Sequence, residues 1–193
     1  YSLPNFYYAN STYSPIVANV SMFIANTATS TFYGTLTSDS VNGNLTATLT
    51  TTTSPSNVGI VVGATLNGTG VQKGMYVVKN LTGTPTSVGS TWQVTVPIGT
   101  YANSTSNISM TLVSTTANIT TVANGIVGVG DWIYKSSGIT TNTFITASSA
   151  ENNSLTGAGG TGTYLVNQPQ TVGTQASPVA GFNLQVPYVG FNA

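Results

Sequence analysis

The sequence predicts an all-β fold: two tandem four-stranded antiparallel units that form a sandwich or barrel-like domain, with extended N- and C-terminal segments. Three observations support this prediction. Thr, Val, Ile, Tyr, Gly and Asn dominate the composition, while the strong helix formers Lys, Glu, Arg and Gln are scarce. Short runs rich in β-branched residues alternate with clusters of Gly, Asn, Ser and Pro, as strands alternate with turns. Two stretches of the chain also match each other.

Eight segments have the composition of strands, and they form two sets of four. Residues 44–49 align with 107–112, 62–66 with 129–133, 75–78 with 143–146, and 89–94 with 162–166. These matches predict a tandem repeat of about 65 residues, in which neighbouring units bury a shared apolar surface. The expected strands are 44–50, 59–66, 75–79 and 91–97 in the first unit, and 108–113, 132–135, 143–147 and 163–167 in the second.

The matches divide the chain into four segments. An aromatic-rich N-terminal segment spans residues 1–43, two β repeats span 44–106 and 107–175, and an extended C-terminal segment spans 176–193. Gly68 and Gly70 predict a tight turn in the first repeat, because glycine adopts positive φ without steric cost. The glycine-rich run at 157–162 predicts the equivalent hairpin turn. A strand follows this run and no Lys is near it, which argues against a phosphate-binding loop.

Charged residues make up 3% of the chain, against about 25% in an average globular protein. They are Asp39, Asp131, Glu151, Lys73, Lys79 and Lys135. Without His, Cys or Arg, the chain lacks the groups for Ser–His–Asp or Cys–His catalysis and for a zinc site. A glycosidase would need two of the three acids to face each other, whereas scattered acids in turns are the simpler interpretation. We therefore predict that the protein is not an enzyme, with no catalytic residue, cofactor or metal ion.

The same composition bears on the partners. Three lysines balanced by three acids form no basic patch, so we predict no binding to nucleic acid. The most apolar run, residues 15–25, is interrupted by Asn19 and Ser21 and is shorter than the roughly 20 residues that span a bilayer. We expect it to be a buried strand, with no membrane span. The sequence starts at Tyr1 rather than Met, which fits either removal of a leader or a fragment of a longer chain.

The low charge points to assembly with copies of the chain or with other structural proteins. A nearly uncharged surface provides little repulsion between copies, and uncharged strand edges invite pairing between sheets. The aromatic ends of the chain are either edge strands of its own core or strands that cross to a neighbouring subunit. The candidate inter-subunit contacts are Phe6, Tyr7, Tyr8, Phe182, Tyr188 and Phe191.

The Asn-x-Ser/Thr pattern of N-glycosylation occurs nine times, in a chain so rich in Asn, Ser and Thr that about five or six occurrences arise by chance. Glycosylation at these positions would favour a cell surface over a phage capsid. The candidate acceptors are Asn10, Asn19, Asn44, Asn67, Asn80, Asn103, Asn107, Asn118 and Asn152.

Residues 62–71, followed by residues 89–94, resemble a low-charge β repeat of structural proteins of tailed phages and large DNA viruses. Residues 159–172 carry the closest likeness, and the resemblance covers roughly residues 44–172. It implies a role in capsid decoration, as a minor capsid component or in a fibre, and it carries over no catalytic residue. The second repeat departs from the pattern at Asp131-Trp132 and at 135–137, so its turn can differ.

We therefore expect a structural protein at the virion surface or outside the cell. The first hypothesis is a homo-oligomeric virion or fibre component that self-assembles through β-sheet packing. An alternative is a subunit of an extracellular filament or surface layer, joined by donor-strand exchange and N-glycosylated. A third is a carbohydrate-binding module that uses Trp92, Trp132 or Tyr164 as a stacking platform.

The scarcity of ionisable groups also predicts how stability depends on pH. Folded and unfolded chains should bind similar numbers of protons at most pH values, so the free energy of unfolding should change little with pH. We expect the melting temperature to stay nearly constant between about pH 3 and pH 9. Differential scanning calorimetry across this range tests the prediction, and a steep fall in the melting temperature on acidification would contradict it.

Overall fold

The computed structural model describes residues 7–8, 16–38, 46–95, 106–135, 137–186 and 189–190, and in these residues it contains strands and turns but no helix. The all-β prediction is confirmed. The strands are β1 (Tyr7–Tyr8), β2 (Ile16–Ser38), β3 (Thr46–Thr51), β4 (Thr65–Gly68), β5 (Val77–Thr82), β6 (Thr91–Thr95), β7 (Ile108–Gly125), β8 (Trp132–Tyr134), β9 (Ile145–Ala147), β10 (Gly162–Val166), β11 (Val179–Gln185) and β12 (Val189–Gly190).

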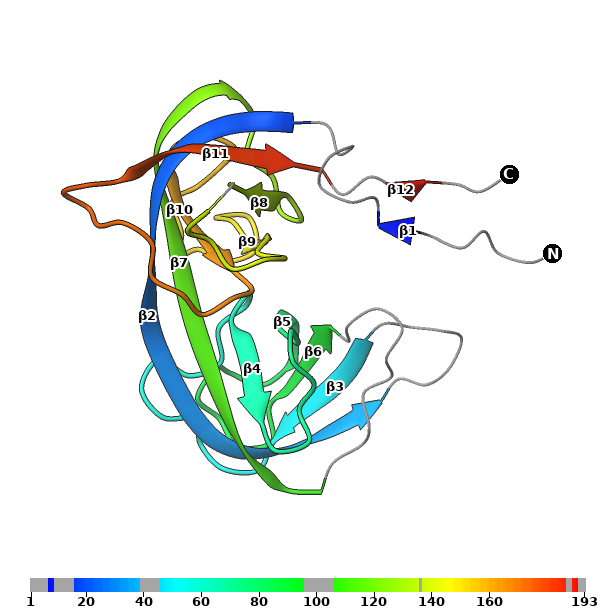
Figure 1. Cartoon of the computed structure of the whole chain (residues 1–193). Coiled ribbons are helices and arrows are strands. Elements are labelled where there is room, and N and C mark those ends of the chain that lie inside the picture. Colours follow the sequence, from blue (N-terminus) through cyan, green and yellow to red (C-terminus); the bar gives the residue numbers. More distant parts are fainter. Residues whose placement is uncertain are drawn as a thin grey trace.

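Two long strands, β2 and β7, organise the fold. They pair antiparallel from Ala18↔Gly125 to Gly34↔Ile108, and Figure 1 shows them as one curved pair along the whole arc of the molecule. The other strands extend this pair into one ten-stranded antiparallel sheet, which curls into a half-barrel. The order of the main path is β5-β6-β3-β2-β7-β10-β9, with β4 added beside β7, and β11 and β8 added beside β2.

The curl has a local cause in β2. Its pairing with β7 shifts register at three places, and each shift adds twist and bend, as a β-bulge does. The shift between Asn26 and Ala28 lies near the middle of the strand, and it leaves Thr27 without a partner residue in the ladder. The hydroxyl of Thr27 instead lies 3.2 Å from the carbonyl of Ser114 and 2.9 Å from the hydroxyl of Thr116.

The predicted four-stranded units are not confirmed. Each half of the molecule has six strands, and both halves include part of β2 and part of β7 (Figure 1). In one half the order is β5-β6-β3-β2-β7-β4, and in the other it is β9-β10-β7-β2-β11-β8. The first and last strands of each series meet through an isolated bridge, Thr65↔Tyr76 in one half and Trp132↔Phe144 in the other.

The two halves also repeat the same hydrogen bonds at these bridges. In the first half, Gly63 N donates to Val77 O, Val77 N to Ala64 O, and Leu66 N to Met75 O. In the second half, Gly130 N donates to Ile145 O, Ile145 N to Asp131 O, and Ile133 N to Thr143 O. The predicted match of residues 62–66 with 129–133 therefore places equivalent backbone groups at equivalent positions.

The first predicted match, of residues 44–49 with 107–112, is wrong. Leu49 in β3 pairs with Trp92 in β6, and the corresponding pair in the other half is Ala117 with Tyr164. Position 49 in the first half is therefore equivalent to position 117 in the second half. The part of β7 that begins at Ile108 belongs to the first half, and its equivalent in the second half is β11. Residues 107–112 share the alternation of polar and apolar residues at 44–49, whereas residues 112–117 read Leu-Val-Ser-Thr-Thr-Ala and do not.

Each half encloses its own hydrophobic core. One is built around Leu36, Leu49, Leu66, Met75 and Met110, all fully buried. The other is built around Met22, Ile24, Tyr164, Phe182 and Leu184, also fully buried.

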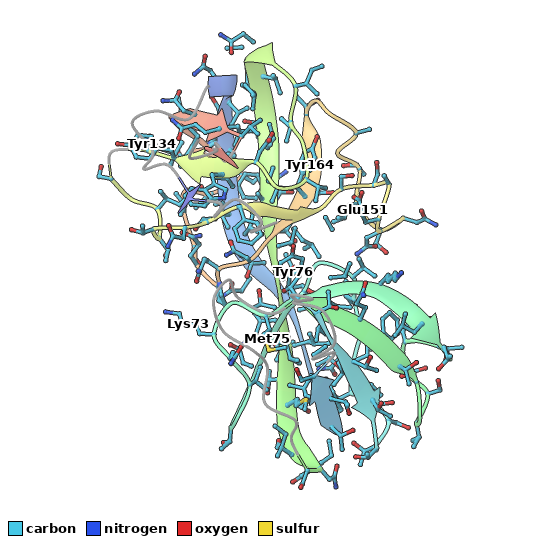
Figure 2. All side chains as sticks on the ribbon, turned by 90° about the vertical axis from the view of Figure 1, so that its right-hand side faces the viewer. Lys73, Met75, Tyr76, Tyr134, Glu151 and Tyr164 are labelled. Atoms are coloured by element: carbon cyan, nitrogen blue, oxygen red, sulfur yellow. The ribbon has the colours of Figure 1, made fainter. Side chains whose placement is uncertain are left out.

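The halves meet through polar and apolar contacts. The hydroxyl of Thr146 donates to Gly63 O at 2.7 Å, and that of Thr65 donates to Asn167 O at 3.0 Å. The rings of Tyr76 and Phe144 pack edge to face with centroids 5.8 Å apart, and Figure 2 shows Tyr76 between the halves. These contacts add to the shared strands and hold the halves together.

Several predicted strands differ from the observed ones. Residues 59–64 contain no strand, only a turn at 62–63, and β4 begins only at Thr65. The strand expected at 108–113 continues to Gly125, and the strand expected at 15–25 continues to Ser38 at the centre of the sheet. Near the two ends, β1 and β12 pair with each other as a separate two-stranded sheet (Figure 1). The four predicted domain segments stay a prediction, but β3, β7 and β11, from three of them, all belong to the same sheet as β2.

The glycine-rich run at 157–162 is not the predicted equivalent of the turn at 68–71, which lies between β4 and β5: it forms a bend before β10 that closes over Tyr164. The Tyr164 hydroxyl accepts a hydrogen bond from Gly159 N at 3.0 Å and donates one to Gly160 O at 2.8 Å. A Cβ atom on Gly157 would lie 2.2 Å from the Tyr164 ring, whereas one on Gly160 would meet nothing within 4 Å.

We predict that Gly157→Ala lowers the free energy of unfolding by about 1–3 kcal/mol, because the fully buried Tyr164 ring must move within a packed core. Gly160→Ala is the matched control in the same turn, and we expect its effect to stay within about 0.5 kcal/mol. Urea denaturation of both variants tests this pair of expectations. Equal stability of the two variants would show that the turn does not constrain Tyr164.

Candidate functional site

The ionisable side chains do not gather at one place in the described part of the chain. Asp131 is buried, and its Oδ2 accepts a hydrogen bond from Gly128 N at 2.7 Å. Glu151 is exposed in a separate turn, where its Oε2 accepts bonds from Ser148 N at 2.9 Å and from Ser148 Oγ at 2.7 Å. Figure 2 shows Lys73 and Glu151 on different halves. The described residues contain no group of three or more potential metal-ligating side chains, and Asp39 lies outside them.

The two acids respond to pH in opposite directions. Burial raises the pKa of Asp131, and the bond from Gly128 N offsets part of that rise. Hydrogen bonds from Ser148 lower the pKa of Glu151. Asp131 therefore lowers stability as the pH rises from about 3.9, its ordinary pKa, through its folded value. Glu151 contributes stability above its ordinary pKa and loses that contribution as the pH falls through its folded value.

Two of the three aromatic residues of the carbohydrate-binding hypothesis belong to the core. Tyr164 is fully buried, which raises the pKa of its hydroxyl, and its ring is covered by the glycine-rich turn. Trp92 is 3% exposed, and its indole nitrogen donates to Ser90 Oγ at 3.0 Å. Trp132 is half-buried at the bridge to Phe144. Neither Trp92 nor Tyr164 is placed to stack on a sugar.

The structure separates the candidate glycosylation acceptors by their surroundings. Asn10, Asn44 and Asn103 lie outside the described residues. Asn19 Nδ2 donates to Asn183 Oδ1, Asn152 Nδ2 donates to Val62 O at 3.4 Å, and Asn118 lies in a strand that is paired on both sides. The exposed acceptors are Asn67, Asn80 and Asn107.

The candidate inter-subunit contacts separate in a similar way. Phe6, Tyr188 and Phe191 lie outside the described residues, and Tyr7 and Tyr8 form β1. Phe182 is fully buried in the core of its own chain, with Lys135 Nζ 4.8 Å from the centroid of its ring. Phe182 therefore packs within the chain, and we no longer include it among the proposed contacts.

A free strand edge is the feature that sequence analysis missed. The pairing of β7 with β10 ends at Ile119, and no other described strand pairs with residues 120–125 on that side of β7. Five of these six residues are exposed, and the adjoining Ile126 is 71% exposed. The segment has no charged residue. The absence of Gly and Pro from residues 108–124 was the sequence signal that the strand continues past Val113.

The comparisons with known proteins found no match to this chain among family models, curated proteins or solved structures. In the described residues, no helix has the length and apolar character required to cross a membrane.

We predict that Asp131→Asn raises stability at neutral pH. The asparagine carbonyl can still accept the bond from Gly128 N, while the buried charge is removed. The free energies of unfolding of variant and wild type should converge below about pH 3, where the carboxyl of the wild type is protonated in both states. Urea denaturation at a series of pH values measures this difference.

Glu151→Gln is the comparison variant. It removes a carboxylate whose pKa is lowered by hydrogen bonds from Ser148, whereas the pKa of Asp131 is raised. We expect it to lower stability at neutral pH and to have no effect in acid. The interpretation of Asp131 would be wrong if both variants changed stability in the same direction.

Proposed function

We propose that this chain is a non-enzymatic structural protein that self-assembles through β-sheet packing, as a component of a virion surface or fibre. The observation that carries the proposal is the combination of an exposed, uncharged strand edge on β7 with a chain in which charged residues are only 3%. Soluble β-proteins block exposed edges with charges, and a chain that leaves an edge unblocked is suited to pairing with another chain.

Exposed apolar side chains support the same proposal. Val58, Val88, Ile126 and Val129 are each 45–71% exposed in the described structure, and they lie outside the strands and the cores. Single exposed apolar residues are ordinary on protein surfaces. Here almost no charge surrounds them, so desolvating this surface on contact with a partner has a small electrostatic cost.

We also infer that the two six-stranded halves descend from one duplicated unit. The identical strand order and the repeated bridge hydrogen bonds support this inference. It replaces the four-stranded units expected from the sequence, while it keeps the tandem repeat. A protein that already stacks two copies of one unit within a chain can extend the same kind of packing between chains.

A second candidate is a glycosylated subunit of an extracellular filament or surface layer. The exposure of Asn67, Asn80 and Asn107, each in an Asn-x-Ser/Thr pattern, favours it. Intact mass spectrometry of the native protein separates the two candidates, because covalent glycan on these residues favours the cell surface.

We expect the purified protein to form assemblies larger than its 19.7 kDa chain, with a self-association constant that changes little with salt. The physical reason is that contacts between uncharged surfaces depend on apolar burial and backbone hydrogen bonds rather than on screened charges. Sedimentation velocity at about 0.05 M and about 0.5 M salt, followed by negative-stain imaging, tests this expectation. A chain that remains a monomer at millimolar concentration would overturn the proposal.

A further inference from the structure

We propose that residues 120–125 of β7 pair antiparallel with the same residues of a second copy of this chain, which joins the two ten-stranded sheets across a two-fold axis. This inference rests on the proposed function, because it names the surface through which the chain would self-assemble. It starts from the end of the β7–β10 ladder at Gly162↔Ile119. Beyond this pair, β7 continues with β2 on one side and with no described strand on the other.

The backbone of this segment is already held in strand conformation. Asn124 pairs with Asn19, Val122 with Val20, and Thr121 with Ser21. A partner strand would therefore add to an ordered edge, without the entropy cost of ordering a loop. Thr120, Thr121 and Asn124 are exposed, so another backbone can approach them.

Two other strand edges of the molecule have a lysine, whereas residues 120–125 have none. β5 is the last strand of the main path on its side, and Lys79 is exposed within it. β11 pairs with β8 only from Asn183 onward, and Lys135 Nζ donates to the Ala180 carbonyl in the part before that. Lysine at an edge strand opposes pairing with another sheet, because the ammonium group would have to be desolvated. Two of the three lysines thus protect edges, and residues 120–125 have no such protection.

A second copy is the occupant that fits this edge. Antiparallel pairing of a segment with itself is self-complementary, since each copy offers the same backbone donors and acceptors to the other around a two-fold axis. The segment Thr-Thr-Val-Ala-Asn-Gly carries no charge that would repel its copy. The adjoining Ile126 and Val129, 71% and 45% exposed, lie next to the edge in sequence and offer apolar surface for burial in the contact.

The test compares two Thr→Lys variants that make the same change of charge. Thr121→Lys places an ammonium group on the proposed contact, and the side chain of Thr121 is exposed, without a hydrogen bond to another described residue. Thr86→Lys places the same group in an exposed turn of the other half. We expect Thr121→Lys to weaken self-association at least tenfold by sedimentation equilibrium, because it adds to the paired segment an ammonium group that the contact would have to desolvate. Thr86→Lys should associate as the wild type does.

Single-cysteine variants provide a second measurement. The chain has no native Cys, so any disulfide must join two copies at the introduced residue. When residues 120–125 of two copies pair antiparallel, Val122 of one copy lies opposite Ala123 of the other, within reach of a disulfide. We expect an equimolar mixture of Val122→Cys and Ala123→Cys to form a mixed covalent dimer under mild oxidation, and Thr86→Cys to form none.

The outcomes separate this inference from the proposed function. A wild type that does not self-associate overturns both. A wild type that self-associates, together with an unchanged Thr121→Lys variant and no mixed covalent dimer of Val122→Cys with Ala123→Cys, overturns the β7 contact and leaves self-assembly standing. If Thr121→Lys does not fold, as judged by its melting temperature, the cysteine variants decide the question by themselves.

Discussion

The antiparallel pairing of β2 with β7 is the interaction on which the rest of the structure depends. Each half of the molecule needs part of both strands to complete its series of six, so neither half can form its sheet alone. The shared strands also connect the two halves. The two cores lie on either side of the register shift at Thr27. Loss of this pairing would expose both cores at once, which makes cooperative unfolding of the two halves the natural expectation.

The class of fold follows from the sequence, but the lengths of its central strands do not. Alternation of apolar and polar residues marks strands wherever one face is buried, and it located β3, β6 and β10 closely. It failed at Ser114, Thr115 and Thr116, which look like a polar strand end yet are buried. The hydroxyl groups of Thr115 and Thr116 have partners across the sheet, Asn26 and Thr27, and such pairing depends on tertiary structure. The opposite error occurred at 59–64, where apolar residues lie in a segment without strand structure, in which Gly59 and Gly63 adopt positive φ.

For the candidate site too, composition predicts some properties, and only the structure shows the others. The scarcity of ionisable groups is a property of composition, so the argument against acid–base and metal chemistry needs no coordinates. The positions of individual residues do need them. Phe182 and Tyr164 are aromatic residues that the sequence could equally place at an interface, and only the packing shows that they fill a core. The free edge of β7 exists because its pairing with β10 ends at Ile119. The sequence of neither strand alone predicts where the pairing between the two strands ends.

The distribution of the few charges completes the physical picture. Lys79 lies in the outer strand β5, and Lys135 donates to the carbonyl of Ala180 in the part of β11 before its pairing with β8 begins. These positions fit the proposed assembly, because lysine opposes pairing at these two edges while residues 120–125 carry no lysine. Specific assembly requires both conditions, because a chain with every edge open would aggregate without order and a chain with every edge protected would stay a monomer. Two lysines at strand edges serve this purpose in the proposed assembly, so a low number of charges is compatible with a defined assembly.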